Sequence, residues 1–346
     1  MQSAKCRIIK QKLLKITKTM IIENSKTYNV NDVENLFFRP TFCGKAAEEL
    51  GIRVLYNMPL PTKVPVFSHN NNILKNFKAG WQGGTSATLL QREIEMSKLK
   101  AESAYSADDY FSTIYEIITN SSDVNLGDLT GTDLEKAETE LFRRSLADSI
   151  YATTWFGDTT GTISQHKSFD GFLAQIVKAC NEEESNIQVT LQEEECEYHI
   201  ENLFNNVWHC ASDDLRALVS EGNLAFFVSS DVYDAYHFYL DEKGVIDVSA
   251  AGEGCRPMLT YHGIPLVEVP SKGYNLTRCE SFCILTDRRN LVLALNTADS
   301  PEKEIRMWYN PDEMENRQRV VFLAGTTIVD EKLLSGDIFV YGVSFN

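Results

Sequence analysis

YNPDEMENRQRVVFLAGTTIVDEKLLSGDIFVYGVSFN, residues 309–346, decides the fold class of this 346-residue chain. Residues 319–323 and 326–329 are apolar and rich in β-branched side chains, which predicts strands with Gly325 as a turn or bulge between them. Residues 337–343 predict a last strand close to the C-terminus. A sheet of short strands must bury its apolar face against another element, so we expect a helix from earlier in the chain to cover it.

A long helix over residues 132–157 is the predicted partner of this sheet. Thr132 and Glu135 fit a capping box at its start, and Gly157 is a natural stop. Two apolar stripes at helical spacing follow the cap: Leu134, Ala137 and Leu141, and then Phe142, Leu146 and Ile150. At about 1.5 Å per residue the helix is about 35 Å long. We expect Leu141 and Leu146 to lie between it and one sheet that holds both 319–323 and 337–343.

Composition limits the class of protein. Apolar residues make up 43% and charged residues 24%, which is ordinary for a globular chain with two or three domains. No apolar run reaches the ~18 residues of a membrane span, and the N-terminus does not predict a secretion signal. The eight cysteines form no CxxC pair, which favours a reducing cytosol over a disulfide framework.

The charge is strongly acidic and unevenly distributed. A formal net charge of −16 argues against a nucleic-acid-binding surface as the main function. Residues 1–20 nevertheless carry six basic residues and no acid, whereas residues 181–201 carry eight Glu and no Lys or Arg. Both segments read either as solvated surface or as a basic arm that docks on an acidic surface of a neighbouring copy.

Residues 61–104 predict a protruding β-hairpin. Residues 63–67 read as a short strand, a Gly-rich tip follows with Gly80, Gly83 and Gly84, and residues 89–100 alternate polar and apolar side chains. A helix is then expected to open at Asp108. Because so long an excursion cannot bury itself within its own subunit, we expect it to lie on a neighbour.

The second half predicts alternating helices and strands. Residues 199–220 have helical spacing with a break at 212–214, residues 225–229 form an apolar strand, and Ser230 or Asp231 caps a helix that ends at Gly244. Residues 263–269 and 281–285 predict strands. Residues 287–290 are expected to turn the chain into 291–295 as a hairpin.

Four phrases in this order resemble the major capsid proteins of tailed bacteriophages with the Hong Kong 97 fold. They are FDGFL at 169–173, AFFVSSDVYDAYHFYL at 225–240, YHGIPLVEVP at 261–270 and RVVFLAGTTIVDEKLL at 319–334. Each phrase is weak alone, and their order and spacing make the resemblance more specific. It runs over most of residues 55–346.

The resemblance implies an α+β fold with named parts. Residues 1–60 would be an N-terminal arm and 61–104 an extended β-hairpin loop. Residues 105–199 and 305–346 would form a peripheral domain with the spine helix 132–157, and residues 200–304 an axial α/β domain. The implied function is a structural shell subunit that assembles with itself into pentamers and hexamers of an icosahedral head around double-stranded DNA. That head would be assembled in the host bacterial cytoplasm.

The implied partners are further copies of the chain, DNA held without sequence-specific contact, and, as open additions, separate scaffolding, portal and decoration proteins. No membrane partner is implied. Residues 1–28 are too short for the scaffolding segment that some relatives carry. Lys98 and Lys100 lie near the return arm, but no motif supplies an Asn or Glu partner for the covalent cross-link that some relatives form. Bacterial encapsulin shells share the fold and remain an alternative.

An uncharacterised enzyme is the remaining alternative. Cys196, His199, His209 and Cys210 are zinc-type ligands, but their spacing matches no common zinc motif, and ordinary helix residues are the preferred interpretation. Residues 80–86, GWQGGTS, lack the Gly-Lys-Ser/Thr ending of a P-loop. His166 and His262 have no identifiable nucleophile partner. The sequence therefore predicts no catalytic, cofactor-binding or metal-binding residues and no cofactor.

Overall fold

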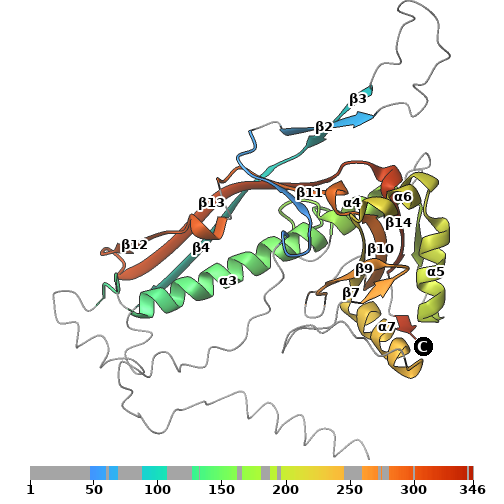
Figure 1. Ribbon diagram of the computed structural model, residues 1–346. Coiled ribbons are helices and arrows are strands. Elements are labelled where there is room, and N and C mark those ends of the chain that lie inside the picture. The colour runs from blue at the N-terminus through green and yellow to red at the C-terminus, as the bar shows by residue number, and fades with distance from the viewer. Residues whose placement is uncertain are drawn as a thin grey trace, which may run out of the picture. The chain divides into compact units, whose positions relative to one another are not determined.

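The computed structural model describes residues 47–59, 62–68, 88–106, 127–131, 133–161, 166–180, 188–192, 196–244, 259–271, 274, 280–298, 301–340 and 343–345 (Figure 1). These residues fall into two compact units. The smaller takes the described residues within 104–138 and 307–317, and the larger holds the rest. Of the predicted N-terminal arm, 1–60, residues 1–46 and 60 lie outside the described residues, as do the hairpin tip and the helix opening at Asp108.

A six-stranded sheet forms the centre of the larger unit. Its order is β5 (Gln188–Gln192), β14 (Leu334–Phe339), β10 (Ser281–Asp287), β7 (Leu224–Ser229), β9 (Ile264–Val269) and β8 (Thr260–Tyr261). Every residue of β7, β10 and β14 is buried, which requires a covering layer on each face of the sheet.

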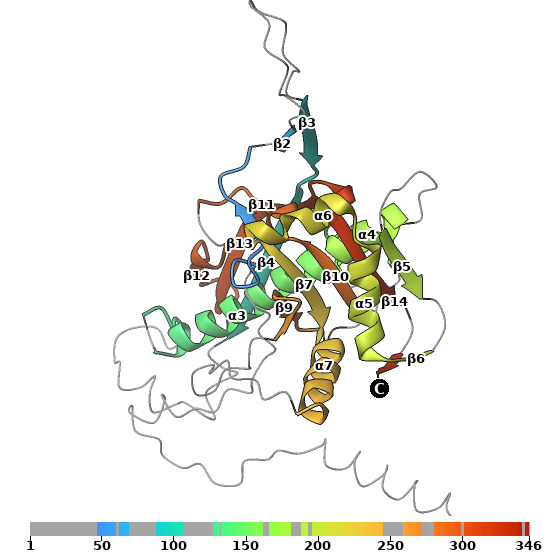
Figure 2. The same cartoon turned by 45° about the vertical axis from the view of Figure 1, so that its right-hand side comes forward.

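Alternate residues of these strands enter two different cores. Ala225 and Phe227 face α4 (Phe172–Cys180) and the end of the long helix α3 (Asp133–Phe156). Phe226 and Val228 face α5 (Ile200–Cys210) and α7 (Ser230–Glu242), which Figure 2 shows beside the strands. The strands therefore lie in the middle of a helix–sheet–helix sandwich.

A second sheet has the order β1 (Arg53–Leu55), β11 (Leu291–Leu295), β13 (Glu315–Ile328) and β12 (Arg306–Asn310), and β4 (Ser97–Ser106) also pairs with β13. Val320, Phe322 and Ala324 point from β13 into a core with Leu146 of α3, while Arg319 and Val321 are exposed. This alternation is the expected pattern of a half-buried strand.

The predicted helix is confirmed as α3, 24 residues long. Glu135 reaches back as a capping residue, but its carboxylate accepts from the Gly131 N–H at 2.5 Å, one residue earlier than predicted. Leu146 packs on the second sheet, and about one and a half to two and a half turns later Tyr151 and Trp155 pack on the six-stranded sheet. The Trp155 ring lies 5.4 Å from that of Phe172 and 5.5 Å from that of Phe227, measured between ring centroids. One helix thus joins both sheets.

Three predictions about strand pairing are wrong. Residues 319–323 and 337–343 do not share a sheet, because β13 belongs to the second sheet and β14 to the six-stranded one. Residues 337–343 are not one strand either: β14 ends at Phe339, and β15 (Val343–Phe345) pairs instead with β6 (Cys196–Tyr198). Residues 287–290 do not close a hairpin. They form a 3-10 turn, η4 (Arg288–Asn290), that carries the chain from β10 in one sheet to β11 in the other.

Other local predictions hold. The break at 212–214 is confirmed, because Ser212 caps α6 (Asp213–Ala217) by accepting from the Leu215 N–H at 3.2 Å. α7 begins at Ser230, with Ser229 rather than Ser230 or Asp231 at its cap position, and Gly244 follows its end at φ 68°. None of the helices that the structure describes is both long enough and apolar enough to span a membrane.

Candidate functional site: the root of the β2–β3 hairpin

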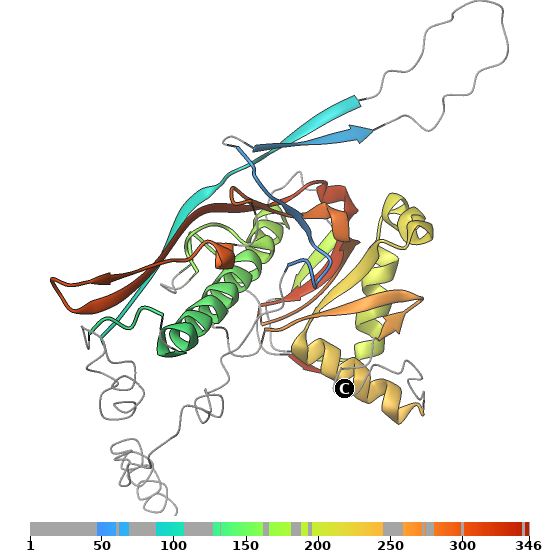
Figure 3. The same cartoon turned by 60° about the vertical axis from the view of Figure 1, so that its left-hand side comes forward.

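The predicted hairpin is confirmed in its described part. β2 (Thr62–Ser68) pairs antiparallel with β3 (Thr88–Ile94), in a register that runs from Thr62↔Ile94 to Ser68↔Thr88. Figure 3 shows the two arrows, blue and cyan, running side by side. Among the described residues these strands form a sheet of their own, with no third strand. Because a lone two-stranded hairpin is marginal in water, this pair needs support from elsewhere.

The root of the hairpin packs against its own subunit, contrary to the expectation that the whole excursion lies on a neighbour. Val64 and Ile94, at most 2% exposed, join Val292 and Ala294 of β11 in a small apolar core. β4, the continuation of β3, then pairs with β13. The protruding part is therefore shorter than the predicted segment.

Gly325 determines where the chain bends between β3 and β4. A Cβ atom at Gly325 would lie 2.2 Å from the Glu95 carbonyl oxygen, which is closer than any real contact. Gly325 lies inside the continuous strand β13, so the predicted turn or bulge is wrong. The glycine is needed because the backbone at Glu95 and Met96 crosses directly over it.

An ion pair also connects the hairpin to the body of the unit. Arg92 on β3 pairs with Glu331 on η6 (Glu331–Leu333). Their side chains are 47% and 36% exposed, so the pair contributes at most about 1 kcal/mol to stability.

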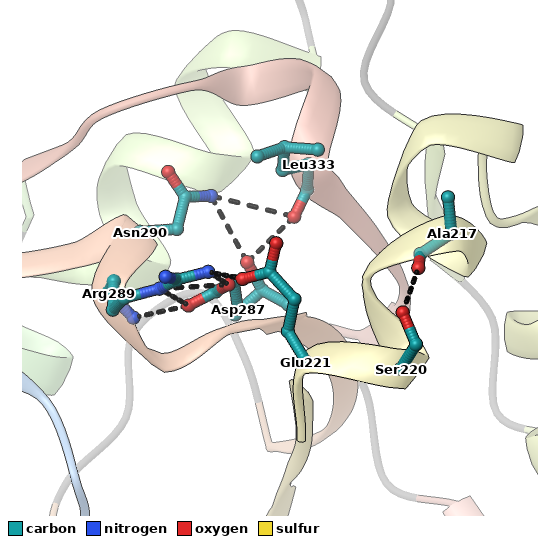
Figure 4. A network of polar contacts seen from close by, with 8 residues as sticks. Ala217, Ser220, Glu221, Asp287, Arg289, Asn290 and Leu333 are labelled. Carbon is teal, nitrogen blue, oxygen red and sulfur yellow. Dashed lines mark hydrogen bonds and ion pairs between the residues drawn. The ribbon is translucent and has the colours of Figure 1, made fainter. Parts of the chain in front are cut away.

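The turn η6 is itself fixed by the loop that connects the two sheets. Asn290 donates to the Asp330 carbonyl at 2.9 Å, and its side-chain oxygen accepts from the Asp330 N–H at 2.8 Å. Thr286 donates to the Leu333 carbonyl at 2.7 Å and accepts from Asn290. Asn290 also donates to the Leu333 carbonyl, at 3.5 Å (Figure 4). These bonds anchor the segment that carries Glu331.

Arg289 connects this network to a 3-10 turn that lies earlier in the chain. Its guanidinium pairs with Asp287 at 2.6 Å and with Glu221, at the end of η3 (Leu218–Glu221), also at 2.6 Å (Figure 4). The hydrogen bonds that Arg289 donates to Asp287, and then the one to Glu221, raise its pKa above the ordinary value. Sequence reasoning missed this role because it assigned 287–290 to a hairpin turn.

The FDGFL phrase connects the two cores. Phe169 packs with Leu146 and β13, whereas Phe172 and Leu173 pack on the six-stranded sheet. Gly171 donates to the Gly157 carbonyl at 2.8 Å, and a Cβ at Gly157 would lie 2.4 Å from the Phe169 carbonyl oxygen. α3 ends directly before Gly157, as predicted. The sequence did not predict that Gly171 would approach Gly157 so closely.

The zinc-type residues are spread along a helix. His199 directly precedes α5 and His209 and Cys210 end it, so about 15 Å of helix separates the two histidines. Cys196 lies on β6. Within the described ranges, no group of three or more His, Cys, Asp or Glu is placed to hold a metal ion. Cys283 is fully buried, and burial raises its pKa, while Cys279 lies outside the described residues.

The two histidines considered for catalysis lie in turns. His166, at φ 59°, has its Nδ1 3.5 Å from the Thr153 hydroxyl, and burial lowers its pKa despite the opposing effect of Asp148. His262, at φ 49°, and Gly263 form the turn between β8 and β9, and the His262 ring lies 5.8 Å from that of Trp208. Lys98 is exposed and Lys100 pairs with Glu102 at 2.7 Å.

Solved structures share this fold. The capsid of a native GTA particle matches with a TM-score of 0.57 at 13% identity, over 94% of this chain and 98% of that one. The procapsid of satellite phage P4 matches with a TM-score of 0.51 at 11% identity, over 86% and 97%. A chain of Gordonia phage Cozz matches with a TM-score of 0.51 at 9% identity, over 94% and 98%. No protein-family model and no curated protein matches the sequence.

The mixed helix-and-sheet fold of this chain is therefore that of phage capsid proteins, and the resemblance seen in the sequence is confirmed at the level of the fold.

Proposed function

We propose that this chain is the major capsid protein of a tailed phage or prophage, a shell subunit of the Hong Kong 97 type. The observation that carries the proposal is a fold match that covers nearly all of this chain and of each neighbour. So complete a match leaves little of the chain for an added catalytic domain, and no enzymatic activity is proposed.

Under this proposal, each part of the chain corresponds to one part of a Hong Kong 97-type capsid subunit. Residues 1–60 form the N-terminal arm and 61–104 the extended loop. Residues 105–199 and 305–346 form the peripheral domain with α3 as its spine, and 200–304 the axial domain. The support for the loop assignment is the β2–β3 hairpin, whose described strands have no third strand beside them. A neighbouring copy would cover the hairpin in the shell.

Assembly into pentamers and hexamers is the proposed mechanism. Each contact between copies needs to contribute only a few kcal/mol, because a closed symmetric shell multiplies it. The formal charge of −16 suits a container for DNA, since a wall with little positive charge would not bind the packed polyanion tightly. Assembly in the host cytoplasm, and separate scaffolding, portal and decoration proteins, complete the proposal.

Electron microscopy of the purified full-length chain tests this function, with the chain alone and with a phage scaffolding protein supplied. Rings, tubes, sheets or closed shells are the expected result. A chain that remains monomeric under both conditions at high concentration would refute the proposal.

A further inference from the structure

Arg288 and Arg289 are adjacent on the turn η4, yet only Arg289 is neutralised by its surroundings. Arg289 pairs with Asp287 and Glu221. Arg288 donates through its backbone N–H to the Asn223 carbonyl at 3.1 Å, but within the described residues its guanidinium forms neither a hydrogen bond nor an ion pair. Arg288 therefore carries a positive charge that no other described residue neutralises.

The guanidinium of Arg288 is partly removed from water. Its Nε atom is buried and has no hydrogen-bond partner in the part of the chain that the structure describes, whereas its two terminal nitrogens are not fully enclosed. A buried donor normally has an acceptor, and taking a cation out of water is costly unless it is paired. A carboxylate bound at the terminal nitrogens would offset that cost.

Gly51 sets the direction of the Arg288 side chain. Gly51 ends the 47–51 turn at φ 76°, and a Cβ atom there would lie 2.9 Å from both Cδ and Nη1 of Arg288. The arginine thus lies directly over the glycine backbone, in space that a larger residue would occupy. Because packing and not an ion pair orients this cation, it is preorganised for an acceptor from outside the subunit.

A second arginine lies close to this site. Arg53 begins β1 two residues after Gly51, and β1 runs beside η4 as well as pairing with β11. The Arg53 side chain is exposed and has no ion pair among the residues that the structure describes. Arg53 and Arg288 therefore place two unneutralised cations at one end of β1, in a chain whose formal net charge is −16.

The acidic residues in the neighbouring turn do not neutralise this pair. Glu48 accepts from the Tyr56 hydroxyl at 2.9 Å, and Glu49 is exposed. Neither forms an ion pair with any described residue. Glu48 and Glu49 therefore reduce the positive potential near Arg288 without occupying its terminal nitrogens.

We propose that Arg288, with Arg53 beside it, binds a glutamate carboxylate of the acidic segment 181–201 from a second copy of the chain. A planar guanidinium matches a carboxylate with two parallel hydrogen bonds, which the terminal nitrogens of Arg288 can donate. Segment 181–201 has eight Glu and no Lys or Arg, so it is the complementary partner within the sequence itself. The inference rests on the proposed function only in that shell assembly brings the second copy into contact.

Cross-linking of the full-length chain tests the contact directly. Arg288→Lys keeps the positive charge and introduces an amine, which a carbodiimide joins only to a carboxylate in contact with it. Natural-abundance and ¹⁵N-labelled chains of this variant are mixed before assembly, and the cross-linked peptides are identified by mass spectrometry. The expected product joins position 288 to a glutamate of segment 181–201 and appears with mixed labels.

Arg306→Lys is the matched control for the cross-link. Arg306 is also exposed and without an ion pair among the described residues, but it lies on β12, at the opposite edge of the sheet from β1. This control should not give a product with segment 181–201. Assembled Arg288→Lys particles that lack the product, or that give it only within one chain, would overturn the proposal.

Removal of the charge provides a second readout. Arg288→Met keeps an unbranched apolar stem over Gly51, so the melting temperature of the unassembled chain should not fall, because no partner within the subunit is lost. The protein concentration at half-assembly should rise about tenfold. Arg306→Met should change neither quantity. Arg289→Met should instead lower the melting temperature, because it leaves the Asp287 side chain, 4% exposed, without its cation.

Equal assembly by Arg288→Met and the parent would refute the site. DNA phosphate is the other anion in such a particle, and titration of a fluorescent DNA duplex with the full-length chain tests it. The parent, Arg288→Met and Arg306→Met should bind the duplex equally weakly. A loss of DNA binding confined to Arg288→Met would assign the arginine to nucleic acid and overturn the proposal.

Failure of this inference is distinguishable from failure of the proposed function. Shells that form without the mixed-label product would refute the Arg288 contact alone. A chain that never assembles would refute the capsid role, and this contact with it.

Discussion

The six-stranded sheet and the β2–β3 hairpin are built from similar strands but are stabilised in different ways. β7, β10 and β14 are buried on both faces by helices of the same chain. Among the hairpin residues whose side chains the structure describes, Val64 and Ile94 at the root join a core of the subunit, and no third strand covers the described part of the hairpin. The comparison teaches that the sheet serves the fold of one subunit, while the hairpin is available for contacts outside it.

The largest effect is expected at the centre of the sheet. Trp155→Ala removes a 1% exposed ring that packs on Phe172 and Phe227, and should lower the free energy of unfolding by about 3–5 kcal/mol. Urea denaturation followed by circular dichroism measures it. Phe238→Ala is the control, because that ring is 68% exposed and its loss should change stability by less than about 0.5 kcal/mol. Equal effects at both positions would contradict the assigned core.

Leu146→Ala tests the second sheet and should cost about 2–5 kcal/mol, because Leu146 is 5% exposed against Val320 and Phe322. Leu141, predicted from the sequence to share this role, is only half-buried, so Leu141→Ala should cost less. Lys136→Ala on the exposed side of the helix is the near-neutral control. A Leu141→Ala variant less stable than Leu146→Ala would reverse this ranking.

Gly325→Ala tests the point where the β2–β3 hairpin joins the body of the subunit. The new methyl group would meet the Glu95 carbonyl, so the hairpin root must shift, at a cost of about 1–3 kcal/mol. Thermal melting and limited proteolysis should show a less stable chain that is cleaved faster near the root. Gly161→Ala is the control, since its Cβ would meet only the Asp158 side chain, no closer than 3.2 Å, and no backbone atom. Unchanged cleavage in Gly325→Ala would show that the crossing is not rigid.

A smaller effect is expected from pH at the α3–α4 connection. Burial lowers the pKa of His166 in the folded state, so below about pH 6.5 the unfolded chain binds more protons at this position. Its contribution therefore reduces stability as pH falls through that range. His166→Asn, which tolerates φ 59°, should flatten the melting temperature between about pH 7 and pH 5. An unchanged slope would assign the pH dependence to other groups.

The smallest effect on stability, and the largest on assembly, is expected from the hairpin tip. Joining Ser68 to Thr88 through an Asn-Gly turn keeps the β2–β3 register and removes only residues 69–87. The melting temperature should hardly change while particle formation is lost. A longer deletion of 70–99 is unsuitable, because it would remove Ile94 and the start of β4 from the fold of the subunit. Loss of folding in the short deletion would place the tip in the core of its own subunit.

Local signals in the sequence were enough to predict the elements. The extent of α3, the break before α6, the end of α7 near Gly244 and the β2–β3 pair were all predicted, because each depends on residues a few positions apart. The resemblance of four short phrases also predicted the fold class, which the solved structures confirm.

Only the tertiary structure decided which strands pair and which residues meet at the hairpin root. β10 and β11 are adjacent in sequence but lie in different sheets, because β10, buried on both faces, already pairs with β7 on one side and β14 on the other. Gly325 under Glu95, and Arg92 beside Glu331, join segments more than 200 residues apart. The periodic pattern of apolar residues does not predict such contacts, because they arise only when the two sheets pack against the elements that cover them.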